Sequence, residues 1–224
     1  MIRWFTAVTF GLALLVSLAP ADARSHQHRQ HVRTGKPGVF NYYVLSLSWS
    51  PQHCATQFPG PTDPQCAPYR QYGFVVHGLW PQYDSGFPQS CTKGGGLDQA
   101  IVNGVLDIMP SPMLVRHEWD KHGTCSGMAP DAYFAQLRAA YSGVKIPAPY
   151  QQPTTALRLT PRQIKEEFEQ ANAGLQGDSL AVLCAGAYLQ EVRVCLDKDL
   201  HARACGHDVR DQCRGSQVTV RPVR

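Results

Sequence analysis

The chain has 224 residues, of which 43% are hydrophobic and 17% charged, and its formal net charge is +4 at pH 7. After residue 23 no apolar stretch is long enough to span a membrane, so the composition argues against an integral membrane protein. The mild positive charge permits a polyanionic partner without demanding one.

The first 23 residues have the layout of a secretory signal peptide. Arg3 precedes an apolar run over residues 4–19, and small residues follow at 21–23. Residues 24–38 are polar and basic without apolar periodicity, and we expect a disordered leader there. Residues 39–224 then form one domain with a sizeable core. We expect an exported protein, periplasmic or secreted, whose mature form has no membrane association.

All eight cysteines lie in the mature part of the chain. An even number of cysteines in an exported chain predicts four disulfides. Spacing alone cannot choose among the roughly 105 possible pairings. The cysteines are Cys54, Cys66, Cys91, Cys125, Cys184, Cys195, Cys205 and Cys213.

Hydrophobic periodicity predicts a mixture of strands and helices along the mature chain. Apolar and polar residues alternate over residues 40–49, which predicts a strand, and a loop rich in Pro and Gln follows over 50–69. The remaining predicted strands cover 72–76, 180–184, 188–196 and 217–220. Predicted helices cover 97–109, a segment that starts at Pro130, and a segment that ends at residue 171 after a capping box at Thr160 and Gln163. Without a regular βαβ rhythm, the pattern favours an α+β domain.

The densest ionisable cluster is the stretch HEWDKHGTC, residues 117–125. If this stretch is helical, Glu118 and His122 lie four residues apart and meet on one face, and so do His117 and Lys121. A solvated helix end is the plain alternative, but it does not call for two histidines and a tryptophan. A zinc-protease helix needs HExxH, whereas here the residue four positions after His117 is Lys121. An ammonium group in place of the second ligand argues against a metal.

A second candidate segment is HGLWP, residues 77–81, which directly follows the strand predicted over 72–76. His77 at a strand end before Gly78 should be partly exposed, and Trp80 beside Pro81 could offer a flat ring. The alternative is a buried structural histidine with a core tryptophan.

HGLWP, followed some forty residues later by HEWxKHGTC, resembles the two active-site segments of the ribonuclease T2 family. The segments NYYVLSLSWSP and LQEVRVCLDK resemble the first and a late strand of that family. The resemblance implies an α+β domain with a central, mainly antiparallel sheet flanked by helices. It also implies an exported endoribonuclease that needs neither metal nor cofactor, acts on single-stranded RNA with low base specificity, and works as a monomer.

The resemblance also implies roles for individual residues. The base that takes the 2′-hydroxyl proton would be His122, and the acid that protonates the leaving 5′-oxygen would be His77. Transition-state charge would be stabilised by Glu118 and Lys121. The first products would be 2′,3′-cyclic phosphates, which are later hydrolysed to 3′-phosphates.

For the substrate, the resemblance implies that His117 holds the phosphate and that Trp80 stacks on a base. The second aromatic of that base site could be Tyr83 or Phe87. The family's usual disulfide pairing implies the bridges Cys54–Cys66, Cys91–Cys125, Cys184–Cys213 and Cys195–Cys205.

Two other classes stay open at this point. One is an inactive relative that acts as a binding or stress protein, although such relatives usually lose a catalytic histidine and both are present here. The other is a metallohydrolase, which activity in excess chelator would exclude.

Overall fold

The structure, a computed structural model, describes residue 1 and residues 35–56, 63–93 and 95–223. Apart from residue 1, the predicted signal peptide lies outside these residues, as does most of the predicted leader. Gly38, the last residue of that leader, donates its backbone N–H to the carbonyl of Cys125. The described fold therefore begins slightly before residue 39.

Six strands of the described chain form one sheet with the order β2-β1-β5-β6-β3, and β4 pairs with β5 off this path. All paired neighbours are antiparallel except β5 and β6. The predicted α+β class with a mainly antiparallel sheet is confirmed. The strands are β1 (Tyr42–Trp49), β2 (Phe74–Gln82), β3 (Leu157–Leu159), β4 (Leu180–Ala185), β5 (Tyr188–Leu196) and β6 (Val218–Val220).

Strand β1 lies at the centre of the fold because both of its faces are covered. Leu45 and Leu47 point into the main hydrophobic core, whereas Tyr42 and Val44 join a smaller cluster on the opposite face. That smaller cluster also contains Trp80. Since side chains alternate along a strand, the even-numbered residues of β1 share the face on which Trp80 lies.

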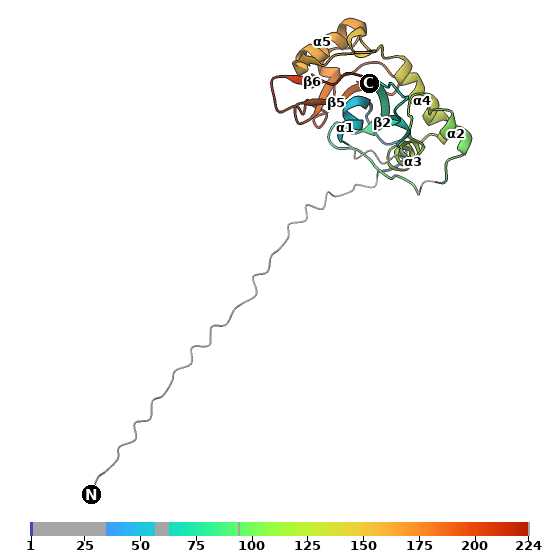
Figure 1. Ribbon diagram of the computed structural model, residues 1–224. Coiled ribbons are helices and arrows are strands. Elements are labelled where there is room, and N and C mark those ends of the chain that lie inside the picture. The colour runs from blue at the N-terminus through green and yellow to red at the C-terminus, as the bar shows by residue number, and fades with distance from the viewer. Residues whose placement is uncertain (2–34, 57–62, 94, 224) are drawn as a thin grey trace. The chain divides into compact units, whose positions relative to one another are not determined.

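The helices are α1 (Ser50–Thr56), α2 (Gln99–Asn103), α3 (Pro112–Lys121), α4 (Pro130–Ser142) and α5 (Pro161–Ala171). Helices α2, α3 and α4 gather beside β2, while α5 lies apart from them against β3 and β4 (Figure 1). The predicted capping box of α5 is present, with reciprocal hydrogen bonds between Thr160 and Gln163. Ser111 caps α3 by accepting the N–H of Leu114, and Pro112 occupies the first turn. The described residues contain no helix that could cross a membrane.

Three predicted segments were wrong in their extent or type, and one short strand was not predicted. The segment predicted as a loop over 50–69 contains α1, and strand β3 was not predicted, because segments this short carry little periodic signal. The helix predicted over 97–109 is reduced to α2 and a series of turns beyond Gly104. Glycine weakens a helix, yet Val102 and Val105 are still buried as expected. The third error, at β2, shapes the site described below.

The described chain forms four disulfides and contains no free cysteine. They are Cys54–Cys66, Cys91–Cys125, Cys184–Cys213 and Cys195–Cys205. The pairing implied by the family resemblance is therefore confirmed.

Candidate active site

A β-bulge in β2 places His77 on the same face as Trp80. The predicted strand end at residue 76 was wrong, because β2 continues through HGLWP to Gln82. Val76 pairs with Leu47 and Gly78 pairs with Ser46, so His77 is an extra residue without a partner on β1. In a regular strand His77 and Trp80, three residues apart, would point to opposite faces. The extra residue reverses the alternation and brings both side chains to one face.

Two carboxylates flank the His77 ring. Nδ1 of His77 lies 2.6 Å from Oε1 of Glu191 on β5, and Nε2 lies 3.7 Å from Oε1 of Glu118 on α3. Burial by itself would lower the pKa of His77, but the hydrogen bond and charge of Glu191, aided by Glu118, raise it above its ordinary value. With 34% of its side chain exposed, His77 can be reached by solvent, and its two carboxylate neighbours favour the charged form of the ring.

Glu118 is almost completely buried, at 1% exposed, and it is fixed by Trp80. The indole Nε1 of Trp80 donates a hydrogen bond of 2.6 Å to Oε2 of Glu118. This close approach depends on Gly78, because a Cβ atom there would collide with both Oε2 of Glu118 and Nε1 of Trp80. Burial raises the pKa of Glu118, against the opposing charge of His77 and the Trp80 hydrogen bond.

Replacing Gly78 with alanine is therefore expected to disturb the site and the fold together. The added methyl group must separate Glu118 from Trp80, and overpacking of this kind typically costs about 1–3 kcal/mol of stability. Urea unfolding of Gly78→Ala would measure the loss. Gly96→Ala is the matched control, since a Cβ at Gly96 meets nothing within 4 Å. Equal stability of the two variants would contradict the proposed close packing.

His122 lies at the C-cap of α3, and among the described residues no hydrogen bond or ion pair joins its ring to Glu118, although helical spacing would place both on one face. Its backbone N–H still bonds to the carbonyl of Glu118 at 3.0 Å, but its φ of −117° departs from the helical value, and the helix ends here. The His122 ring instead stacks on Trp80, with ring centroids 5.1 Å apart and an angle of 30°. Burial, followed by the positive charges of neighbours such as Lys121, lowers the pKa of His122 to about 3. His122 is therefore a neutral imidazole at ordinary pH.

The remaining predicted residues lie around these two histidines. On α3, His117 is exposed and Lys121 is half-buried. Trp80 keeps only 9% of its surface exposed, because the His122 ring stacks on it and the Arg193 guanidinium lies over its ring at 4.8 Å. A base could stack on Trp80 only if one of these neighbours moved. Phe87, in contrast, is 42% exposed with its ring centroid 6.0 Å from that of His122.

Three further residues at the site, Ser46, Glu191 and Arg193, were not predicted from the sequence. Oε2 of Glu191 accepts hydrogen bonds from Ser46 Oγ at 3.1 Å and from Arg193 Nη2 at 2.9 Å. A signal was present in the strand YLQEVRVCL, where a Glu and an Arg two positions apart lie among mostly apolar residues. Charged residues in such a buried strand require partners.

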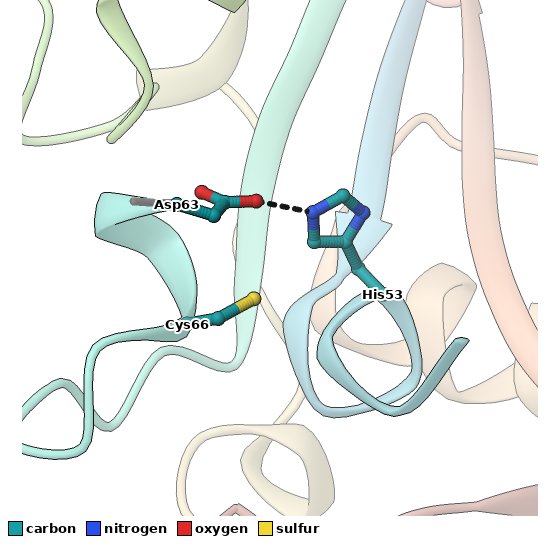
Figure 2. Close-up of side chains that lie close together, drawn as sticks. All are labelled: His53, Asp63 and Cys66. Carbon is teal, nitrogen blue, oxygen red and sulfur yellow. Dashed lines mark hydrogen bonds and ion pairs between the residues drawn. The ribbon is translucent and has the colours of Figure 1, made fainter. Parts of the chain in front are cut away.

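A histidine and a carboxylate also meet outside this site (Figure 2). His53 Nε2 lies 2.9 Å from Oδ2 of Asp63, and Cys66 is close to both. The Cys66 sulfur is bonded to Cys54 and is not a thiolate, so the group lacks the third donor that a transition metal would use. We interpret His53 and Asp63 as a structural hydrogen-bonded pair beside this disulfide.

Comparison with known proteins identifies the class to which this fold and site belong. Residues 40–205 match the ribonuclease T2 family, and the chain belongs to that family. A ribonuclease of Aeromonas hydrophila is 54% identical over 95 residues, which cover 42% of each chain. A probable ribonuclease of Haemophilus influenzae is 34% identical over 131 residues, which cover 52% of this chain and 48% of that protein. The matched stretches thus span about half the length of these two relatives or less.

Among solved structures, the RNase-related protein of Calystegia sepium has the same fold. The TM-score is 0.65 at 23% sequence identity, and the match covers 82% of this chain and 98% of the other.

Proposed function

We propose that this protein is an endoribonuclease that cleaves single-stranded RNA through the substrate's own 2′-hydroxyl group. The observation that carries the proposal is the placement of two histidine rings against the same Trp80 indole with different partners. Burial and cationic neighbours lower the pKa of His122 to about 3, while the hydrogen bond to Glu191 raises the pKa of His77 above its ordinary value. A neutral imidazole beside a charged one is what general base and general acid catalysis require.

In the first step, a ring nitrogen of His122 takes the proton of the 2′-hydroxyl group, and the oxygen attacks the adjacent phosphorus. The bond from phosphorus to the 5′-oxygen breaks, and Nε2–H of His77 protonates that leaving oxygen. The product is a 2′,3′-cyclic phosphate. In the second step water replaces the leaving oxygen, the two histidines exchange roles, and a 3′-phosphate remains.

Positive charge and hydrogen-bond donors would stabilise the negative charge of the transition state. Lys121 and His117 lie one turn apart on α3 and would both contact the phosphate. Glu118, whose Oε1 lies 3.7 Å from Nε2 of His77, would act beside the phosphate that this ring contacts.

We propose Phe87 as an aromatic contact for a substrate base. Its exposed ring lies beside His122, where a base adjoining the reacting phosphate would reach it. Tyr83 is half-buried and its backbone N–H bonds to the carbonyl of Gly86, so it is the less accessible alternative. Stacking tolerates every base, which agrees with low base specificity.

The test is cleavage of RNA homopolymers in excess chelator, with product analysis for 2′,3′-cyclic phosphate ends. We expect cleavage of RNA to continue in the chelator. An oligonucleotide with a single ribose among deoxyriboses should be cut only after that ribose, and the all-deoxy version should stay intact. Loss of activity in the chelator would favour a metallohydrolase, and absence of cleavage would favour an inactive relative.

Glu118→Gln separates two roles for this carboxylate. Because Glu118 contacts Trp80 and approaches His77 rather than His122, we expect the pKa of His122 to change by less than about one unit. The pKa of His77 should fall modestly, since the Glu118 charge helps to raise it. NMR titration of both rings measures this. A fall of a full unit or more for His122 would show that Glu118 acts on the base.

Four disulfides and an extracellular relative from Solanum lycopersicum support export. We propose that the mature protein works in the periplasm or outside the cell, as a monomer that meets RNA in an oxidising environment.

A further inference from the structure

We propose that Glu191 is a positioning residue that fixes His77 in the tautomer with hydrogen on Nδ1 and so presents Nε2 to the leaving group. This inference rests on the proposed function, because it assigns His77 the role of general acid. Ser46 and Arg193 complete the device by holding the carboxylate itself.

The two carboxylate oxygens of Glu191 accept hydrogen bonds from different partners. Oε1 accepts the hydrogen bond from Nδ1 of His77 at 2.6 Å. Oε2 accepts from Ser46 Oγ at 3.1 Å and from Nε and Nη2 of Arg193 at 3.1 and 2.9 Å. With its second oxygen occupied, the carboxylate cannot rotate without breaking several hydrogen bonds. It therefore fixes both the plane and the tautomer of the imidazole.

The sheet holds this network rigidly. On β1, Ser46 pairs with Gly78 of β2 on one side and with Arg193 of β5 on the other. The carboxylate, its two donors and His77 thus come from three hydrogen-bonded strands. Sites on such elements are held more accurately than sites on loops.

Charges around His77 favour an ionised pair. The groups that face its ring are Glu191 and Arg193 from β5, Glu118 from α3, and His122 at the end of α3. Burial would raise the pKa of Glu191, but the hydrogen bond and charge of His77, together with Arg193, lower it to about 2. Glu191 consequently stays ionised wherever His77 is needed as an acid.

Arg193 links this pair to the rest of the site. Its guanidinium binds Glu191 and also lies over the Trp80 ring, and Trp80 in turn binds Glu118. A structural ion pair would not need to bridge the histidine and the second carboxylate in this way. Arg193 thus helps to fix Glu191, and Trp80 helps to fix Glu118, the two carboxylates that flank His77.

Two substitutions of Glu191 separate the effect of its charge from the effect of its side-chain length. Glu191→Gln keeps an acceptor oxygen for Nδ1–H but removes the charge, so the pKa of His77 should fall by about one unit or more. The high-pH limb of the kcat/KM profile should move to lower pH by the same amount. Glu191→Asp keeps the charge but is one methylene shorter, so kcat should fall by about 10–100-fold with a smaller shift of the limb. Glu118→Gln should shift the pKa of His77 less than Glu191→Gln does.

Asp107→Asn, which removes the carboxylate that binds Arg138 elsewhere, is the control and should shift neither the His77 titration nor the pH profile. If both Glu191 variants lowered the melting temperature while the titration of His77 stayed in place, the proposal would be overturned.

Nitrogen-15 shifts of His77 in the unmodified protein provide a test that needs no variant. Neutral His77 should carry its hydrogen on Nδ1, and hydrogen on Nε2 would also overturn the proposal. These titrations do not depend on RNA cleavage, so a protein without ribonuclease activity would refute the proposed function alone.

Discussion

Replacing either His77 or His122 with phenylalanine is expected to lower kcat by about 10²–10⁴-fold, the usual contribution of general acid–base catalysis. Phenylalanine keeps a flat ring of similar size but can neither accept the 2′-hydroxyl proton nor donate one to the leaving oxygen. Single-turnover cleavage of a short RNA by each variant measures the effect directly. A variant with near-normal turnover would remove that histidine from the proposed mechanism.

His201→Phe is the matched control for this pair. His201 is exposed and close to Asp197, outside the site described above, so its replacement should leave cleavage unchanged. A comparable loss in this control would attribute the effect to folding rather than to chemistry.

The pH profile of kcat/KM should be bell-shaped with a broad top. A general base must be unprotonated, so activity is lost as pH falls through the pKa of His122, which is about 3. A general acid must be protonated, so activity is lost as pH rises through the pKa of His77, which lies above its ordinary value of 6.5. In His77→Phe the high-pH limb should disappear from the residual activity.

Removing the Cys91–Cys125 disulfide with paired serine substitutions is expected to cost about 3–4 kcal/mol of stability. The bridge joins residues 34 positions apart, and the unfolded chain gains entropy when that constraint is lost. It also ties the segment after HGLWP to the end of α3, where Ser90 donates its N–H to the carbonyl of Lys121. The variant should therefore unfold at a lower urea concentration, and its cleavage activity should also fall when it is measured at a low temperature at which the variant is still folded.

The Cys54–Cys66 bridge is the control, because it closes only 12 positions and lies away from the two histidines. Its removal should cost about 3 kcal/mol by the same entropy relation, with cleavage retained by the folded protein. Equal loss of activity in both pairs would show that Cys91–Cys125 has no particular role in holding the site.

Local patterns in the sequence were enough to predict many elements of the fold. Strand β1, helices α4 and α5, and strands β4 to β6 follow from periodicity, from Pro130 in a first helical turn, and from the Thr160 capping box. These features depend on residues two to four positions apart, which the sequence displays directly. The chemistry-bearing segments were also visible, because HGLWP and HEWDKHGTC concentrate unusual residue types. The disulfide pairing, in contrast, came from the family resemblance and not from spacing.

The partners of the two histidines were decided only by tertiary structure. His77 binds Glu191, which is 114 positions away, and nothing in either local segment connects them. The α-helical spacing suggested a Glu118–His122 pair, but the helix ends at His122 and the ring turns to Trp80.

The sequence by itself determined which reactive groups the protein carries and which short segments hold them. Tertiary structure decided which face each group occupies and which charge it bears. The bulge at His77 reverses the strand alternation, so His77 and Trp80 lie on the same face, whereas in a regular strand they would lie on opposite faces. Burial favours the neutral form of both imidazoles, but their partners differ: His122 lacks a carboxylate partner and stays neutral, while Glu191 raises the pKa of His77 above its ordinary value. Because burial and cross-strand contacts exist only in the folded chain, an imidazole's charge state cannot be read from its neighbours in sequence.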